Sequence, residues 1–182
     1  MPATAEQVIQ IALKYVGVRE TPPGSNITPF TEAYFDGHLP ANPAASAPWC
    51  VIFGWYVFRE AGASELLCNG AKVGSCSAVL RWASANRLTV AKDQTRRGDI
   101  LLFDWDQPDT VPDHFGLALG PVENGSVHTV EGNTGDEVGL RTRALKNVGY
   151  VIRPKYAANG GNQYVTREEL RAALQVLLEK LN

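Results

Sequence analysis

The sequence is organised around one apolar stretch, Pro48-Trp49-Cys50-Val51-Ile52-Phe53-Gly54-Trp55-Tyr56-Val57-Phe58. A segment that is apolar on every side is either a strand buried in a sheet or a helix that runs through a core. Its length favours the helix, because Arg59 suits a last turn and Gly62 suits a C-terminal stop. Pro48 can start a helix but could not continue one. We therefore expect a buried helix with Cys50 in its first turn.

Cys50 has two interpretations at this position. Unpaired backbone N–H groups and the positive end of the helix dipole meet in the first turn, and both favour a thiolate over a thiol. A free cysteine has a pKa of about 8.5, and such a position lowers it. The alternative is a small buried hydrophobic residue, which is the commonest fate of a free cysteine. Residues elsewhere in the chain are needed to distinguish a reactive thiolate from a buried structural cysteine.

The composition is that of a globular protein. The 182 residues are 45% hydrophobic and 20% charged, which is enough for one domain with a real core and a modest appendage. The net charge of −2 supplies no basic field for nucleic acid or an anionic membrane. No apolar run approaches the 18 or so residues that a membrane span needs. The N-terminus lacks the pattern of a signal peptide, so we expect synthesis in the cytoplasm and another route to any extracellular target.

The cysteines and acids indicate no metal site and no cofactor. Three cysteines are too few for a disulfide scaffold, and no Cys-x-x-Cys pair is present. Cys68 and Cys76 form either a loop staple or two free thiols, and the missing export signal favours free thiols. The cysteines and histidines show no zinc-ligand spacing, and the acids between residues 18 and 47 are too sparse for a calcium loop.

Two further helices are expected before the first strand. The segment Thr4–Val16 has apolar residues at helical spacing, with Thr4 as N-cap. The proline-rich segment Val18–Ala47 is expected to be irregular but ordered by its aromatic residues, which either form one wall of a cleft or anchor the loop in the core. Ser77–Asn86 is expected to be a short helix capped by Ser77.

The second half of the chain has the pattern of strands. The expected strands are Asp99–Phe103, His114–Leu119, Val127–Glu131 and, more weakly, Val138–Arg143 and Gly149–Arg153. The first of these is apolar throughout and is expected to be buried on both faces. Glu123-Asn124-Gly125-Ser126 predicts a hairpin turn. Helices followed by consecutive strands predict an α+β fold, with N-terminal helices packed on an antiparallel sheet.

The C-terminal segment, residues 157–182, is expected to be an appendage to a domain of residues 1–156. Small residues form a linker over 157–162, and Thr166 and Glu169 then form a capping box. A stripe of leucines follows at helical spacing (Leu170, Leu174, Leu177, Leu178 and Leu181). This amphipathic helix has to bury its leucines against its own domain, a second copy or a partner.

Three histidines are candidates to pair with Cys50. Nothing in the sequence near His38 would orient it, whereas His114 opens a buried strand and is held beside a polar loop. Residues two apart on a strand share a face, so Glu131 points away from His128. If the strand geometry persists, Asn133 joins Glu131 and the two can orient the imidazole of His114. We therefore interpret His128 as structural.

Four motifs occur in order along the chain: Pro48-Trp49-Cys50 with its aromatic-rich helix and Ala61-Gly62, Arg97-Gly98-Asp99-Ile100-Leu101-Leu102-Phe103, Asp113-His114-Phe115-Gly116, and Val130-Glu131-Gly132-Asn133-Thr134. Together they resemble the CHAP family, the cysteine- and histidine-dependent amidohydrolase/peptidase domains. The closing Gly149-Tyr150-Val151-Ile152-Arg153-Pro154 also resembles the last strand of that family. The resemblance covers roughly residues 5–156.

The resemblance implies a papain-like fold and hydrolysis of peptidoglycan. It makes Cys50 the nucleophile and His114 the general base, with Glu131 and Asn133 orienting the histidine or shaping the site. It implies an acyl-enzyme route without a metal, in which the backbone N–H of Cys50 is the natural oxyanion donor. The chain then resembles a phage-type endolysin, an N-acetylmuramoyl-L-alanine amidase or an endopeptidase, that reaches the wall through a membrane lesion.

The sequence also departs from the family pattern and leaves alternatives open. The papain signature Cys-Gly-Ser-Cys-Trp is absent, and Val51 stands where the family more often has a small residue. Trp49, Trp105 and Asn26 are candidates for substrate binding, although each can equally serve in packing. The competing functions are a cysteine peptidase completed by His128 and a non-catalytic wall-binding or particle-assembly module. The amide bond that is cut is not specified by the sequence.

Overall fold

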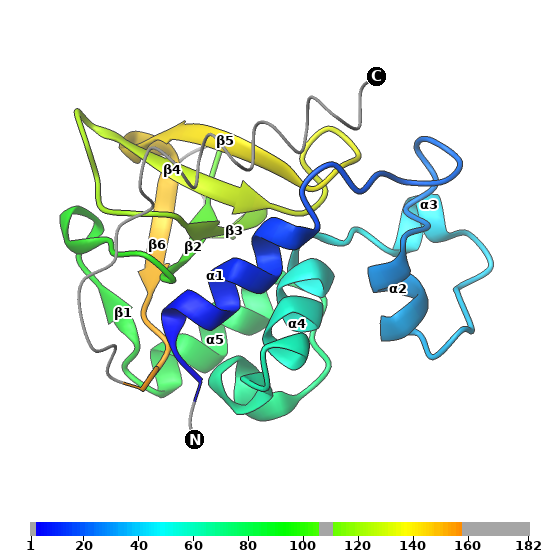
Figure 1. Ribbon diagram of the computed structural model, residues 1–182, viewed down its shortest axis with the longest axis horizontal. Coiled ribbons are helices and arrows are strands. Elements are labelled where there is room, and N and C mark those ends of the chain that lie inside the picture. Colours follow the sequence, from blue (N-terminus) through cyan, green and yellow to red (C-terminus); the bar gives the residue numbers. More distant parts are fainter. Residues whose placement is uncertain (1–2, 106–110, 158–182) are drawn as a thin grey trace.

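The fold is α+β, as expected, with helices packed on one six-stranded antiparallel sheet (Figure 1). The computed structural model describes residues 3–105 and 111–157. The strand order is β1-β6-β2-β3-β4-β5. Within these residues no helix has the length and apolar character needed to cross a membrane. The helix expected after Thr166, and with it residues 158–182 of the predicted appendage, lies outside the described residues.

The strands confirm the predicted series within a residue or two. They are β1 (Thr89–Val90), β2 (Ile100–Phe103), β3 (His114–Ala118), β4 (Ser126–Glu131), β5 (Gly139–Ala144) and β6 (Val148–Ile152). The short strand β1, which pairs with β6, was not expected. The predicted hairpin turn joins β3 to β4, with positive φ at Asn124 (50°) and Gly125 (71°), as a type I′ turn requires.

The helices are α1 (Ala5–Lys14), α2 (Pro29–Tyr34), α3 (Pro43–Ser46), α4 (Cys50–Glu60) and α5 (Cys76–Ala85). Single 3₁₀ turns also occur at η1 (Ser64–Leu66), η2 (Cys68–Gly70), η3 (Lys92–Gln94) and η4 (Leu145–Asn147). Thr4 caps α1 as predicted, and it forms a reciprocal capping box with Gln7. Helix α4 begins at Cys50, which places this residue in the first turn, as predicted.

Two helix predictions were wrong. The segment Val18–Ala47 is not irregular throughout, because it contains α2 and α3, which are too short to show an apolar period. The signal that was missed is Thr28-Pro29, a capping threonine followed by proline at the first helical position. The cap of α5 is Ser75 and not Ser77, since the Ser75 hydroxyl accepts the N–H of Ala78 at 3.2 Å. This earlier start makes Cys76 the first residue of α5.

The sheet is buried on both faces. A large cluster, which includes Ile100 and Leu102 of β2, packs against the helices, and Leu101 and Phe103 belong to a smaller cluster on the other face. Successive residues of a strand point to opposite faces, so the continuous apolar run of β2 serves both clusters. This confirms the expectation that β2 is buried on both sides.

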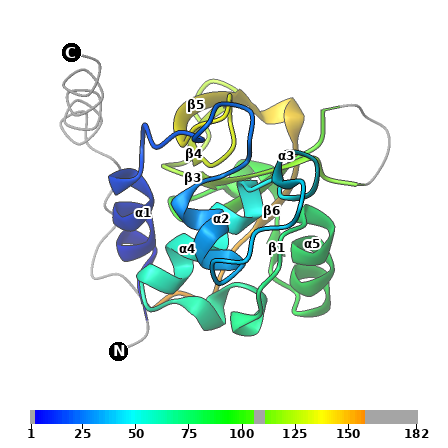
Figure 2. The ribbon, with the colours of Figure 1, turned by 90° about the vertical axis from the view of Figure 1, so that its right-hand side faces the viewer.

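Helix α4 is held against the sheet by two glycines. In Figure 2 it lies between α1 and α5, with β3, β4 and β5 above it. A Cβ atom on Gly54 of α4 would lie 2.5 Å from the ring of Phe115 in β3. A Cβ atom on Gly132, which follows β4, would lie 2.4 Å from the Cβ atom of Phe53 in α4. The helix that carries Cys50 is therefore separated from β3 and from the end of β4 by one phenylalanine side chain at each contact.

Candidate active site

The sulfur of Cys50 lies where helix α4 begins beside strand β3. The first backbone N–H groups of a helix have no partner within it, so they are available to a negative charge at this position. The sulfur hydrogen-bonds with the imidazole of His114, and it accepts the backbone N–H of Phe115. Cys50 is buried, with 8% of its surface exposed. The structure thus brings the two principal predicted residues together.

A second thiol, which the sequence analysis did not assign to the site, also contacts Cys50. Cys76 is the first residue of α5, as Cys50 is of α4, and the two side chains hydrogen-bond to each other. All three cysteines are free, as favoured from the sequence. Nothing in the sequence around Cys76 indicates the contact, because it depends on how α4 and α5 are packed.

His114 connects Cys50 to Glu131. The Nε2 atom of His114 lies 3.0 Å from Oε2 of Glu131, which ends β4. An imidazole has two ring nitrogens, so Nδ1 is left for the sulfur of Cys50. The carboxylate accepts from one nitrogen, and the other faces the thiol, as predicted. Cys50, His114 and Glu131 therefore form one continuous hydrogen-bonded line.

The carboxylate of Glu131 is fully buried and held on both oxygens. The Nε and Nη2 atoms of Arg143 donate to Oε1 at 2.9 Å and to Oε2 at 2.6 Å. The hydroxyl of Thr129 donates to Oε1 at 2.5 Å. A bidentate arginine combines charge with fixed geometry, so it also fixes the orientation of the carboxylate toward His114. Arg143 and Thr129 were not predicted, although both follow from strand alternation once the pairing of β4 with β5 is known.

These contacts lower the pKa of the Cys50 thiol and raise the pKa of the His114 imidazole. Donation from the Cys76 thiol, opposed by burial and assisted by His114 and Phe115, places the pKa of Cys50 well below its ordinary value. Burial would lower the pKa of His114, but its hydrogen bonds to Cys50 and Glu131 outweigh burial and raise it to about 9. Burial likewise opposes charge on Glu131, yet Arg143, His114 and Thr129 lower its pKa to about 2. The favoured state near neutral pH is a thiolate–imidazolium pair beside a carboxylate.

Asn133 lies in a different network from the one predicted. Strand β4 ends at Glu131 and Asn133 has a φ of 55°, so the strand alternation does not extend to it. Its Nδ2 donates to Oδ1 of Asn26 at 3.4 Å rather than to His114. Asn26 in turn donates from Nδ2 to the carbonyl of Ala44 at 2.9 Å. The expectation that Asn133 shares a strand face with Glu131 was therefore wrong.

Trp49 is a core residue in this structure. It is fully buried, its ring packs on Phe30, and its indole N–H donates to Oε1 of Glu20 at 2.8 Å. The other oxygen of Glu20 accepts the backbone N–H of Asn26 at 2.9 Å. Glu20 thus fixes the segment that precedes α2 to the residue next to Cys50. In this arrangement neither Trp49 nor Glu20 presents a surface to a ligand.

Trp105, by contrast, is 42% exposed and lies beside the histidine. Its ring stacks on Phe103 with 5.1 Å between centroids, and its centroid is 6.4 Å from that of His114. The guanidinium carbon of Arg143 lies 4.9 Å from the ring centroid. Of the three predicted substrate-binding residues, Trp105 is the one that is both exposed and adjacent to the Cys50–His114–Glu131 line.

The other two histidines lie apart from this line. His128 is exposed, and its Nδ1 is 2.9 Å from the hydroxyl of Thr142. His38 is exposed near Asp36. Within residues 3–105 and 111–157 no group of three histidine, cysteine or acidic side chains is arranged to hold a metal ion. The interpretation of His128 as a residue facing away from Glu131 agrees with its place on β4.

Close packing around position 116, two residues after His114, leaves room only for glycine. A Cβ atom there would lie 2.9 Å from Cγ of Glu131 and 3.1 Å from the ring of Phe103. Gly116→Ala is expected to displace the Glu131 side chain and to lower the free energy of unfolding by about 1–3 kcal/mol. Gly120→Ala is the matched control, because a Cβ atom at Gly120 meets no atom within 4 Å. Chemical denaturation of both variants measures the difference, and equal stability would contradict the role of Gly116.

No family model, curated protein or solved structure matches the chain.

Proposed function

We propose that this chain is a cysteine hydrolase that cleaves an amide bond of peptidoglycan through a covalent acyl-enzyme intermediate. The observation that carries the chemistry is His114, which hydrogen-bonds to the Cys50 sulfur and to the Glu131 carboxylate. The four motifs that resemble CHAP domains support the substrate class and a papain-like arrangement. The proposal extends to a phage-type endolysin that acts on the cell wall as an amidase or endopeptidase.

The reaction follows from the favoured protonation state. The Cys50 thiolate attacks the amide carbonyl, and the carbon–nitrogen bond breaks as the His114 imidazolium gives its proton to the leaving amine. The neutral imidazole then takes a proton from water, which attacks the thioester and releases the acid and the thiolate. The backbone N–H of Cys50, free at the start of α4, is the natural donor to the oxyanion. Glu131 keeps the imidazole oriented and stabilises its charge.

The described residues give no support to a site completed by His128. Its ring bonds to Thr142 and is exposed, whereas the acceptor for His114 is Glu131. A non-catalytic wall-binding module is the remaining competitor. Mass spectrometry of purified peptidoglycan after incubation with the protein decides between them. New amine and carboxyl termini at one bond type support hydrolysis and identify the bond, whereas wall binding without new termini would contradict the proposal.

The pH dependence of kcat/KM is expected to be bell-shaped. Activity needs the Cys50 thiolate, so it rises as pH passes the pKa of Cys50, which lies below the ordinary cysteine value. Activity also needs the His114 imidazolium, so it falls as pH passes about 9. A hydrogen bond to a charged group contributes about 1.5–3 kcal/mol, so loss of the Cys76 donor should raise the pKa of Cys50 by about one to two pH units. Cys76→Ala is therefore expected to move the acid limb to higher pH.

The control for this effect is Cys76→Ser, which retains a donor hydroxyl and should restore most of the acid limb. Cys68→Ala removes another buried thiol, whose pKa is raised to about 11 by burial and which makes no contact with His114. It should leave the profile unchanged. An acid limb that is the same in Cys76→Ala and in the unmodified protein would show that Cys76 does not stabilise the thiolate.

A further inference from the structure

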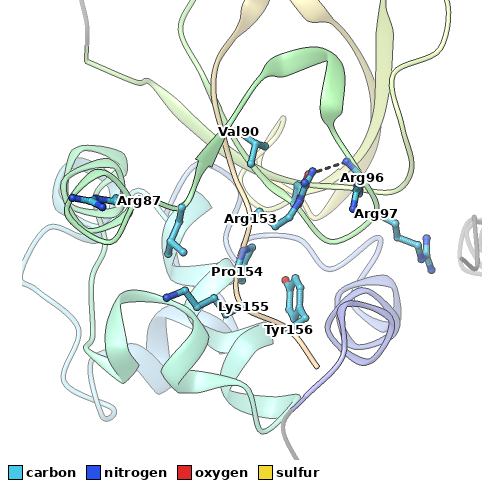
Figure 3. A pocket seen from close by; sticks show the side chains of 10 residues that line it. Arg87, Val90, Arg96, Arg97, Arg153, Pro154, Lys155 and Tyr156 are labelled. Atoms are coloured by element: carbon cyan, nitrogen blue, oxygen red, sulfur yellow. Dashed lines mark hydrogen bonds and ion pairs between the residues drawn. The ribbon is translucent and has the colours of Figure 1, made fainter. Parts of the chain in front are cut away.

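A pocket of about 450 Å³ lies where β1, the turn before β2 and the end of β6 meet (Figure 3). None of its lining residues belongs to the Cys50–His114–Glu131 line. The chain has 17 lysines and arginines and a net charge of −2, yet five of these cations line this one pocket (Arg87, Arg96, Arg97, Arg153 and Lys155). Among the described residues that line it, Asp99 is the only acid.

Two of the five cations are neutralised by acids. Arg153 donates from Nε and Nη2 to the two carboxylate oxygens of Asp99 at 2.9 and 2.7 Å. Arg97 donates from Nε and Nη2 to the carboxylate of Glu6 in α1 at 2.7 and 3.1 Å. These pairs connect distant segments and account for both side chains as structural elements. Neither of these acids contacts the side chain of any of the other three cations.

Arg87, Arg96 and Lys155 are exposed at the rim of the pocket. Among the described residues no carboxylate forms an ion pair with any of them. In Figure 3, Arg87 and Arg96 lie on either side of Arg153, with Lys155 below. Three cations around one pocket favour an anionic ligand, and a doubly charged phosphate monoester gains more from them than a single carboxylate does.

The backbone at Arg87 supports a role for this side chain beyond the local fold. Helix α5 ends in a Schellman motif, with the N–H of Leu88 bonded to the carbonyl of Ala83 and that of Arg87 bonded to that of Ser84. Arg87 occupies the left-handed position with a φ of 54°, where glycine is strongly preferred. An arginine is thus present at a site where glycine would suit the helix better.

The floor of the pocket is apolar. It is formed by Leu88, Val90, Pro154 and Tyr156, whose ring is fixed by a hydrogen bond from its hydroxyl to the carbonyl of Gly98 at 2.8 Å. An apolar floor beneath a charged rim suits a ligand with a compact carbon body and one strongly anionic group. We propose that this pocket binds a phosphate group carried on a small polyol or sugar, with the phosphate held at the cationic rim and the body on the floor. This inference does not depend on the proposed hydrolase activity.

Calorimetric titration of the full chain with glycerol 3-phosphate tests the proposal. We expect saturable binding that weakens with added salt, because the contacts are between exposed charges. Glycerol should not bind, and inorganic phosphate should bind more weakly because it cannot use the floor. A short oligomer of glycerol phosphate distinguishes the sources of this chemistry. Tighter binding of the oligomer assigns the pocket to a phosphodiester polymer, and tighter binding of the monomer assigns it to a free phosphorylated metabolite.

Two double variants distinguish binding in the pocket from a general effect of the net charge of the protein. The double change Arg96→Gln and Lys155→Gln should weaken glycerol 3-phosphate binding by about tenfold or more. Arg81→Gln with Lys146→Gln removes the same charge at exposed positions outside the pocket and should leave binding unchanged. Equal weakening in the two double variants, no saturation, or inorganic phosphate binding as tightly as glycerol 3-phosphate would overturn the proposal.

Arg87→Gly is expected to weaken ligand binding while raising thermal stability, so a loss of binding in this variant could not be caused by unfolding. Glycine suits the left-handed position, so this variant should unfold at a higher temperature than the unmodified protein. It should nevertheless bind glycerol 3-phosphate more weakly, because it lacks one of the three rim cations. A variant that is more stable and binds equally well would show that Arg87 makes no contact with the ligand, contrary to the proposal.

Discussion

Cys50→Ala is expected to abolish the release of new termini from peptidoglycan while leaving the protein folded. The thiolate is the attacking group, and nothing else in the Cys50–His114–Glu131 line can form the acyl-enzyme bond. Removal of a nucleophile costs at least about 10³-fold in kcat, because the remaining groups only position water and substrate. The measurement is mass-spectrometric quantification of released termini, with circular dichroism to check the fold. Cys68→Ala, at another buried free thiol, is the matched control.

The same variant has a second readout that needs no substrate. The hydrogen bond and charge of Cys50 help to raise the pKa of His114 to about 9, against the effect of burial. In Cys50→Ala that contribution is absent, so the histidine should titrate at lower pH in an NMR experiment. An unchanged titration would show that the ring and the sulfur are not in contact. Full hydrolytic activity in Cys50→Ala would instead contradict the proposed mechanism even if the contact exists.

Glu131→Gln is expected to lower kcat by on the order of 10²–10⁴-fold, since a buried acid that orients a catalytic histidine contributes about this much. The amide of glutamine can donate to Nε2 of His114 and so stabilise the tautomer that carries its proton on the side of the thiol. The pKa of His114 should fall, because Glu131 is one of the groups that raise it. The alkaline limb of the pH profile should therefore move to lower pH, which a purely structural effect would not cause.

Stability should change with the same substitution. Breaking a buried ion pair by removing one partner costs about 3–5 kcal/mol, and a smaller loss is expected here because the side chain of Arg143 remains 24% exposed. The pKa of Glu131 is lowered to about 2, so its contribution is present above the pKa of an unfolded glutamate and is lost as pH falls through about 2. Glu131→Gln should remove that part of the acid dependence of unfolding.

The control for Glu131→Gln is Glu137→Gln, which makes the same change of charge. Glu137 pairs with Arg19 and Arg141 at the start of β5 and has no contact with His114. Its replacement should leave both limbs of the pH profile in place. If Glu137→Gln and Glu131→Gln had the same effect on kcat, the result would indicate a general electrostatic contribution rather than orientation of His114.

The parts of the fold that follow from local patterns could be predicted. The capped helix at Thr4, the buried helix at Cys50 and the continuous apolar run of β2 each carry their signal in adjacent residues. Helices α2 and α3 could not be found by periodicity, because six and four residues do not complete an apolar stripe. Strand β1 consists of two residues and is defined only by its pairing with β6.

The candidate site was predictable where residue type and strand position act together. His114 opens a strand and Glu131 ends one, and alternation places Glu131 on the face opposite His128. Cys76 and Arg143 were missed because their roles depend on contacts between elements that are distant in sequence. Asn133 was misplaced for a related reason. The backbone leaves the extended conformation after Glu131, and Asn133 itself has a positive φ. The sequence alone does not indicate where this change of conformation occurs.

The glycines at positions 54 and 132 also constrain how this protein can be re-engineered. At each position the glycine backbone packs directly on a phenylalanine ring or its Cβ atom, so a single aromatic side chain separates the element that carries the sulfur from the strands that carry the imidazole and its carboxylate. An enlarged residue at Phe53 or Phe115 could be accommodated only by moving these parts relative to one another. Thermostabilising redesign of this interior is therefore a change to the catalyst as well as to the scaffold, and it is better directed to surfaces remote from α4.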